Sequence, residues 1–308
     1  MSEFDRSESM ADKANLANEL AEASAERHKY VLDKIETAPP IDPDSVDLTV
    51  KNPDRLRAGL KSELEYSFAV ESEVMRNVKE LHHLFPEMPD TDRLFVDELW
   101  RPHEQMHGLA IGRLLDEIGL EEPPMDLETI SPKMRVLAAL GRSAAIADVE
   151  RLIYYLTGAS TEKAATMLYD SMTKTLKGLG ETAIENTLIG QIKRQEPIHL
   201  AYYRKAAEEL TGQLSPWQLH LTRVLRSKSF NLVGVTNRQR QQTMGQIISD
   251  NIGYGDEQLE PYAEKIGIVD HQLLWAERQG MKVPPYILKA LKDSVEVHKE
   301  ATENSSLA

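Results

Sequence analysis

EQMH at residues 104–107 and EPIH at residues 196–199 repeat one pattern, Glu-x-x-His, and this repeat decides the fold. Both copies lie in long segments with helical periodicity. Because residues three apart share one face of a helix, each copy can direct a carboxylate and an imidazole toward one point. Two such helices, with one Glu from each of two further helices, provide the ligands of a carboxylate-bridged di-iron centre in a four-helix bundle.

The composition limits the classes of site and partner. The 308 residues include no cysteine, which excludes disulfides and thiolate metal sites and fits a reducing, cytoplasmic location. Histidine and carboxylates remain as ligands, and they suit iron, manganese or zinc. The net charge of −14 argues against nucleic-acid binding. No apolar run approaches about 18 residues, so we expect no membrane span, and the acidic N-terminus does not resemble a secretion signal.

The hydrophobic periodicity predicts an all-α protein. We expect a polar N-terminal arm at residues 1–52, a single helical domain at 53–295 and a mobile tail at 296–308. The predicted helices of the domain are 53–84, 92–118, 131–156 (with Ser131-Pro132 at its start), 161–176, 181–210, 216–230 and two or three more. Thr157-Gly158 is the predicted break between the third helix and the next one.

The two further carboxylates have several candidates each. In the first helix Glu71 lies in the most apolar context, after Tyr66-Ser67-Phe68-Ala69-Val70, and its rivals are Glu63, Glu65 and Glu73. In the third helix Glu150 lies in the apolar run 146–155, and its rivals are Glu162 and Glu185. A structural salt bridge that pairs Glu150 with Arg151 is the alternative to metal ligation.

From about Pro53 to Leu288 the chain resembles the soluble acyl-carrier-protein desaturases of the ferritin-like di-iron superfamily. Residues 96–108 resemble the family's W-x-x-E-E-N-R-H-G motif, Val149-Glu150-Arg151 resembles Q-E-R, and residues 196–204 resemble E-N-L-H with a downstream Y-R. Val70-Glu71 resembles T-E-D. The resemblance implies a ferritin-like four-helix bundle with additional C-terminal helices and two iron ions, for which a manganese–iron pair is an alternative. The ligands it implies are Glu71, Glu104, His107, Glu150, Glu196 and His199.

The chain departs from that family around the motifs. Many desaturases have an acidic residue before each Glu-x-x-His, where this chain has His103 and Gln195. The interval from Glu150 to Glu196 is longer than in the family, and we assign the extra length to the helix at 161–176. Pro102 and Pro197 each remove a backbone donor, and we expect a kink or a locally widened helix at both.

The resemblance implies an oxygen-dependent oxidation of an unactivated C–H bond, as in desaturation of an acyl chain held by an acyl-carrier protein. Because groups around the ligands tune a metal's reactivity, a hydroxylase or N-oxygenase of specialised metabolism is an alternative, as is a ferritin-like iron-binding protein that is not an enzyme. The resemblance further implies a homodimer and an external electron donor such as ferredoxin.

Residues 211–249 contain no Asp or Glu. In this stretch Arg223, Arg226 and Lys228 occupy the position of the family's carrier-docking residues, although a solvated basic face is the alternative reading. The candidate lining residues of a substrate channel are Phe68, Leu99, Met106 and Tyr203, for which ordinary core packing is the alternative.

Overall fold

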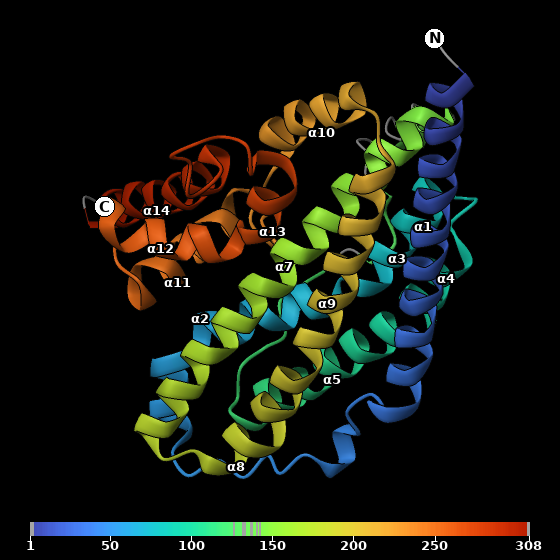
Figure 1. The fold of residues 1–308 in the computed structure, drawn as a ribbon. Coiled ribbons are helices and arrows are strands. Elements are labelled where there is room, and N and C mark those ends of the chain that lie inside the picture. Colours follow the sequence, from blue (N-terminus) through green and yellow to red (C-terminus); the bar gives the residue numbers. More distant parts are fainter. Residues whose placement is uncertain are drawn as a thin grey trace.

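Four long helices form the centre of the molecule in the computed structural model (Figure 1). They are α2 (Pro53–Ser72), α5 (Arg101–Glu117), α7 (Ala144–Leu179) and α9 (Gly190–Gln213). Helix α7 packs along α9, α2 packs along α5, and α2 also contacts α7. The structure describes residues 3–306 except 126, 131–133, 136–137, 140 and 142, and this part of the chain has helices but no strand.

Three of the predicted helices are interrupted. The predicted helix 53–84 divides at Glu73 into α2 and α3 (Val74–Leu84). The predicted helix 92–118 comprises α4 (Asp90–Leu94), a π-helical stretch at Phe95–Trp100 and α5. The predicted helix 181–210 comprises α8 (Thr182–Ile184), a π-helical stretch at Glu185–Ile189 and α9. Local widening therefore precedes Pro102, as expected, whereas Pro197 lies within the continuous α9.

The predicted break at Thr157-Gly158 is wrong, because α7 continues through both residues. Gly158 allows close packing between two helices and does not end a helix. A Cβ atom at this position would lie 2.5 Å from the ring of Tyr203 on α9. The glycine thus allows the tyrosine ring to lie directly against the α7 backbone. The predicted helix start at Ser131-Pro132 lies outside the described residues.

The N-terminal segment, predicted as a polar arm, begins with a helix that packs on one side of the central helices. Helix α1 (Glu3–Thr37) contacts α9 and α4. Its Arg27 pairs with Asp92 at 2.5 Å and with Glu209 at 2.8 Å, and its Val31 is fully buried. Residues 38–52 include a short 3₁₀ turn (Pro43–Ser45) and cross one end of the central helices to reach α2 (Figure 1).

The C-terminal helices cover α2 and α7 on the other side (Figure 1). They are α10 (Pro216–Ser229), α11 (Arg238–Asn251), α12 (Asp256–Ile266), α13 (Ile268–Asp270), which continues into a π-helical stretch at His271–Trp275, and α14 (Pro285–Ser306). Residues 296–306 of the expected tail are therefore part of a helix, and residues 307–308 lie outside the described chain. No helix in the described chain is long and apolar enough to cross a membrane.

Candidate metal centre

Each of the four central helices places acidic or imidazole side chains between two apolar cores. On α5, buried Leu99 in the preceding π-helical stretch belongs to one core and Ile111 to the other, with Glu104 and His107 between them. The same order holds on the other three helices, where the residue or residues between the cores are Glu71 on α2, Glu162 on α7, and Glu196 with His199 on α9. The fold therefore encloses a layer of ionisable groups between the two apolar cores.

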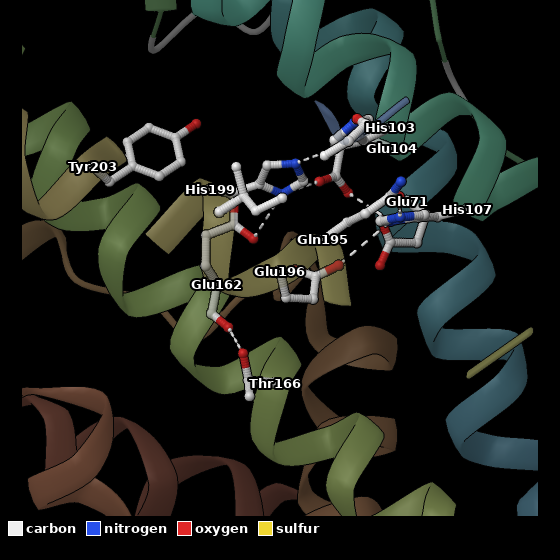
Figure 2. A network of polar contacts seen from close by, with 12 residues as sticks. Glu71, His103, Glu104, His107, Glu162, Thr166, Gln195, Glu196, His199 and Tyr203 are labelled. Atoms are coloured by element: carbon white, nitrogen blue, oxygen red, sulfur yellow. Dashed lines mark hydrogen bonds and ion pairs between the residues drawn. The ribbon is translucent and has the colours of Figure 1, made fainter. Parts of the chain in front are cut away.

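Six buried side chains meet in this layer (Figure 2). Ligand atoms of one group lie within 4.8 Å of one another, and the same holds for a second group. The first group is Glu71, Glu104, His107 and Glu196; the second is Glu104, Glu162, Glu196 and His199. Buried carboxylates and imidazoles that converge in this way could hold metal ions, because both are donors that transition metals prefer.

Glu104 and Glu196 belong to both groups. The carboxylate of Glu104 directs Oε1 toward His199 Nδ1 at 3.0 Å and Oε2 toward His107 Nδ1 at 3.7 Å. Glu196 Oε1 lies 3.4 Å from His107 Nδ1. A carboxylate with one oxygen on each side of the cluster is placed to bridge two cations.

Five of the converging atoms are buried and have no hydrogen-bond partner. They are Glu71 Oε2, Glu104 Oε1, His107 Nδ1, Glu196 Oε1 and His199 Nδ1. Burying a polar atom without a partner costs free energy, and five such atoms facing one another would be a large defect in a purely structural core. Cations at this point would satisfy all of them, so the residues present fit a metal pair.

The electrostatics of the cluster also fit cations. Burial and then the nearby charge of Glu104 raise the pKa of Glu71, Glu162 and Glu196 well above the usual range. Burial opposes ionisation of Glu104 as well, but the close approach of Glu71, His107 and His199 to its carboxylate holds its pKa well below the usual range. Four carboxylates this close share protons when no cation is present, because like charges in a buried site repel one another.

Glu150, predicted as the sixth ligand, lies outside both groups, and its rival Glu162 is the α7 carboxylate that belongs to one of them. Both residues are on α7, 12 residues apart, which corresponds to roughly 18 Å along a helix. Glu162 Oε2 lies 3.6 Å from His199 Nδ1. Glu150 is buried elsewhere with an unpartnered oxygen, and burial raises its pKa to about 7. Its neighbour Arg151 pairs with Asp148 instead.

The remaining rivals have other partners. Glu73 pairs with Arg240 at 2.9 Å and Arg76 at 3.0 Å. Glu63 accepts a hydrogen bond from Asn251, and Glu65 and Glu185 pair with lysines on the surface. On α2, Glu71 is the carboxylate that reaches the cluster.

The predicted docking residues do not form one exposed surface. Arg226 is 2% exposed and donates to Asp270, Ser160 and Thr157 inside the protein. It is therefore a structural cation, not a docking residue. Arg223 is half-buried over the ring of Trp275, and Lys228 is exposed.

The predicted channel residues pack in the cores. Phe68, Leu99 and Tyr203 are at most 4% exposed, and Met106 packs against the same core as Phe68. None of these four lines the cavity of about 260 Å³ that lies between α2, α7 and the C-terminal helices. That cavity has largely apolar walls and reaches Glu71 and Tyr169, whose hydroxyl donates to Glu71.

Comparison with known proteins assigns no family. No protein-family model matches the chain, and neither a curated protein nor a solved structure matches it. The likeness to the desaturases therefore rests on the short motifs, and functional conclusions rest on the geometry of the cluster.

Proposed function

We propose that this chain is a di-iron oxidoreductase on a ferritin-like four-helix bundle, which uses dioxygen to oxidise an organic substrate with an apolar body. The observation that carries the proposal is the set of five unpartnered buried atoms facing one another between two apolar cores. Once ionised, the four carboxylates carry four negative charges, which two divalent cations would neutralise. A mixed manganese–iron pair fits the same donors.

In this proposal each residue of the cluster has a defined part. Glu71 and His107 would hold one ion, Glu162 and His199 would hold the other, and Glu104 and Glu196 would contact both. Tyr169 orients Glu71 through its hydroxyl. When bound, the iron pair supplies the electrons that activate dioxygen. The two apolar cores keep bulk water away from the reacting groups.

The cavity beside Glu71 is the observation that favours an organic substrate. Its apolar walls come from α2, α7 and the C-terminal helices, and Glu71 is the member of the cluster that lines it. An apolar chain in this cavity would place a C–H bond beside the cluster. Desaturation of a carrier-bound acyl chain is the form of the reaction that the resemblance implies, with Lys228 as the exposed member of the predicted docking residues.

Hydroxylation or N-oxygenation is the second candidate reaction. The observation that favours it is the neutral surroundings of the ligands, since His103 and Gln195 contact the two metal-facing imidazoles where many desaturases have acids. Neutral partners donate less electron density to a histidine ligand than carboxylates do, and this changes metal reactivity.

Mass spectrometry of candidate substrates tests the proposal. The iron-loaded chain is incubated with a reductant, dioxygen and acyl chains, either free or on a carrier protein. Loss of two hydrogen atoms indicates desaturation, and gain of one oxygen atom indicates oxygenation. Iron binding without any oxidised product from either class of substrate would favour an iron-binding protein over an enzyme.

A cavity-filling substitution tests where the substrate binds. Ala164 lines the cavity two residues after Glu162. We expect Ala164→Phe to retain the metal and lose substrate oxidation, while Ala164→Ser, which keeps the cavity open, retains both. Equal oxidation by Ala164→Phe and the unsubstituted chain would show that the substrate binds elsewhere.

A further inference from the structure

Both imidazoles of the cluster are tied to the segment that follows α1. His199 Nε2 lies 2.9 Å from His103 Nδ1, and His103 Nε2 lies 2.8 Å from the backbone oxygen of Ala38. His107 Nε2 lies 2.7 Å from Gln195 Oε1, and Gln195 Nε2 donates to the backbone oxygen of Pro39 at 2.7 Å. Two adjacent carbonyl groups therefore end two separate hydrogen-bond chains. Figure 2 shows His103 and Gln195 beside the imidazoles that they contact.

The first hydrogen-bond chain determines which ring nitrogen of His199 presents a lone pair to the cluster. A carbonyl oxygen only accepts hydrogen bonds, so Nε2 of His103 carries a proton. His103 is fully buried and bears no carboxylate bond, so its ring is neutral and its Nδ1 accepts. Nε2 of His199 is then the donor, and its Nδ1 presents a lone pair toward Glu104 and Glu162.

The second chain does the same for His107 through an amide. The Pro39 carbonyl oxygen accepts, so the NH₂ group of Gln195 faces it and the amide oxygen faces His107. Nε2 of His107 therefore keeps its proton. The atom left to bind a metal is Nδ1, which lies 3.4 Å from Glu196 and 3.5 Å from Glu71.

We propose that the carbonyl groups of Ala38 and Pro39 select the metal-binding nitrogen of both histidines, acting through His103 and Gln195 as positioning residues. Residues 38–39, which adjoin α1, are then part of the metal centre although they contain no ligand. The inference rests on the metal-binding part of the proposed function and on no particular reaction.

The two hydrogen-bond chains support different halves of the metal centre. His103 supports His199, which groups with Glu162, whereas Gln195 supports His107, which groups with Glu71. Removing one of these hydrogen-bond chains should therefore weaken the binding of one metal ion and leave the binding of the other unchanged. General packing damage predicts no such selectivity, so the pattern of binding distinguishes a positioning role from a structural one.

The test is a titration of the metal-free full-length chain with Co²⁺, followed by calorimetry and visible absorption. We expect two equivalents to bind the unsubstituted chain. His103→Leu should lower the affinity for one of the two Co²⁺ ions, and Gln195→Met should also lower the affinity for one. Each loss should be about 10–100-fold, as found when outer partners of metal ligands are lost. The double variant should weaken both. His103→Asn restores an acceptor for His199 and should recover part of the affinity.

Gln191→Leu is the matched control. It removes an amide that donates to the Thr187 carbonyl in the π-helical stretch before α9 and lies outside the cluster, so both ions should bind as before. Thermal unfolding of each metal-free variant reports folding separately. Two ions at unchanged affinity in both His103→Leu and Gln195→Met would overturn the inference, as would equal losses in Gln191→Leu. Failure of the unsubstituted chain to bind Co²⁺ would instead refute the metal centre itself.

Discussion

Replacing Arg226 by methionine should destabilise the protein strongly, although sequence reasoning placed this residue on a docking surface. Arg226 is 2% exposed and its partner Asp270 is fully buried, with Nε–Oδ2 at 2.8 Å and Nη2–Oδ1 at 3.3 Å. The guanidinium also donates to Leu156 O, Ser160 Oγ and Thr157 Oγ1 on α7. This pair joins α10 and α13 to the central helices.

The expected magnitude follows from the charge left behind. Removing one partner of a buried ion pair costs about 3–5 kcal/mol, because the other charge stays buried. Unfolding entropy of about 2.1 cal/mol/K per residue gives roughly 0.65 kcal/mol/K for this length. The melting temperature of Arg226→Met should therefore fall by roughly 5–8 °C.

Thermal unfolding by calorimetry or circular dichroism measures this shift. Lys228→Met, two residues further along α10 at an exposed position, is the matched control and should change stability by less than about 0.5 kcal/mol. Adding Asp270→Asn to Arg226→Met removes the stranded charge and should recover part of the loss. Equal melting temperatures for Arg226→Met and Lys228→Met would refute the argument from burial.

Three further outcomes follow from the packing and the pKa shifts. Gly158→Ala should lose stability, because overpacking against the Tyr203 ring at 2.5 Å costs about 1–3 kcal/mol, whereas Gly178→Ala, with open space around it on the same helix, should gain up to about 1 kcal/mol in chemical denaturation. The pKa of Glu150 is about 7 in the folded protein and about 4.3 in the unfolded chain, so its ionisation lowers stability as pH rises through this window. Glu150→Gln should therefore be more stable relative to the unsubstituted chain at pH 8 than at pH 5. A pH-independent difference in melting temperature would contradict this. Metal affinity should rise with pH across the neutral range, since the raised pKa values of Glu71, Glu162 and Glu196 mean that binding releases protons; calorimetry in buffers of different ionisation enthalpy would show no proton release if this were wrong.

Sequence periodicity predicted the helical class, and the two Glu-x-x-His pairs predicted four of the six side chains in the cluster, because each pair is a local pattern on one helix face. The apolar residues before Glu71 predicted the fifth. The sixth was misplaced, yet a signal for it existed. Glu162 lies 18 residues before Gly180 and Glu196 lies 16 residues after it. On antiparallel helices joined there, such spacings put both carboxylates at about the same height, roughly 24–27 Å from the turn. Glu150 lies 30 residues before that turn, too far along α7.

Other features had no local signal. The role of Gly158 depends on a tyrosine 45 residues later, so the glycine resembled a helix stop. The burial of Arg226 depends on Asp270, 44 residues away. The hydrogen bonds from His103 and Gln195 end on backbone oxygens of residues 38 and 39, and every residue type has such an oxygen.

Metal analysis of the purified chain after growth with iron tests the central claim most directly. The proposed centre predicts about two metal ions per chain in the unsubstituted protein and in Glu150→Gln, with loss of metal in Glu162→Gln because this carboxylate lies in the cluster. Circular dichroism would confirm that both variants are folded. Fewer than about one ion in the unsubstituted chain, or metal lost from Glu150→Gln and kept by Glu162→Gln, would contradict the account.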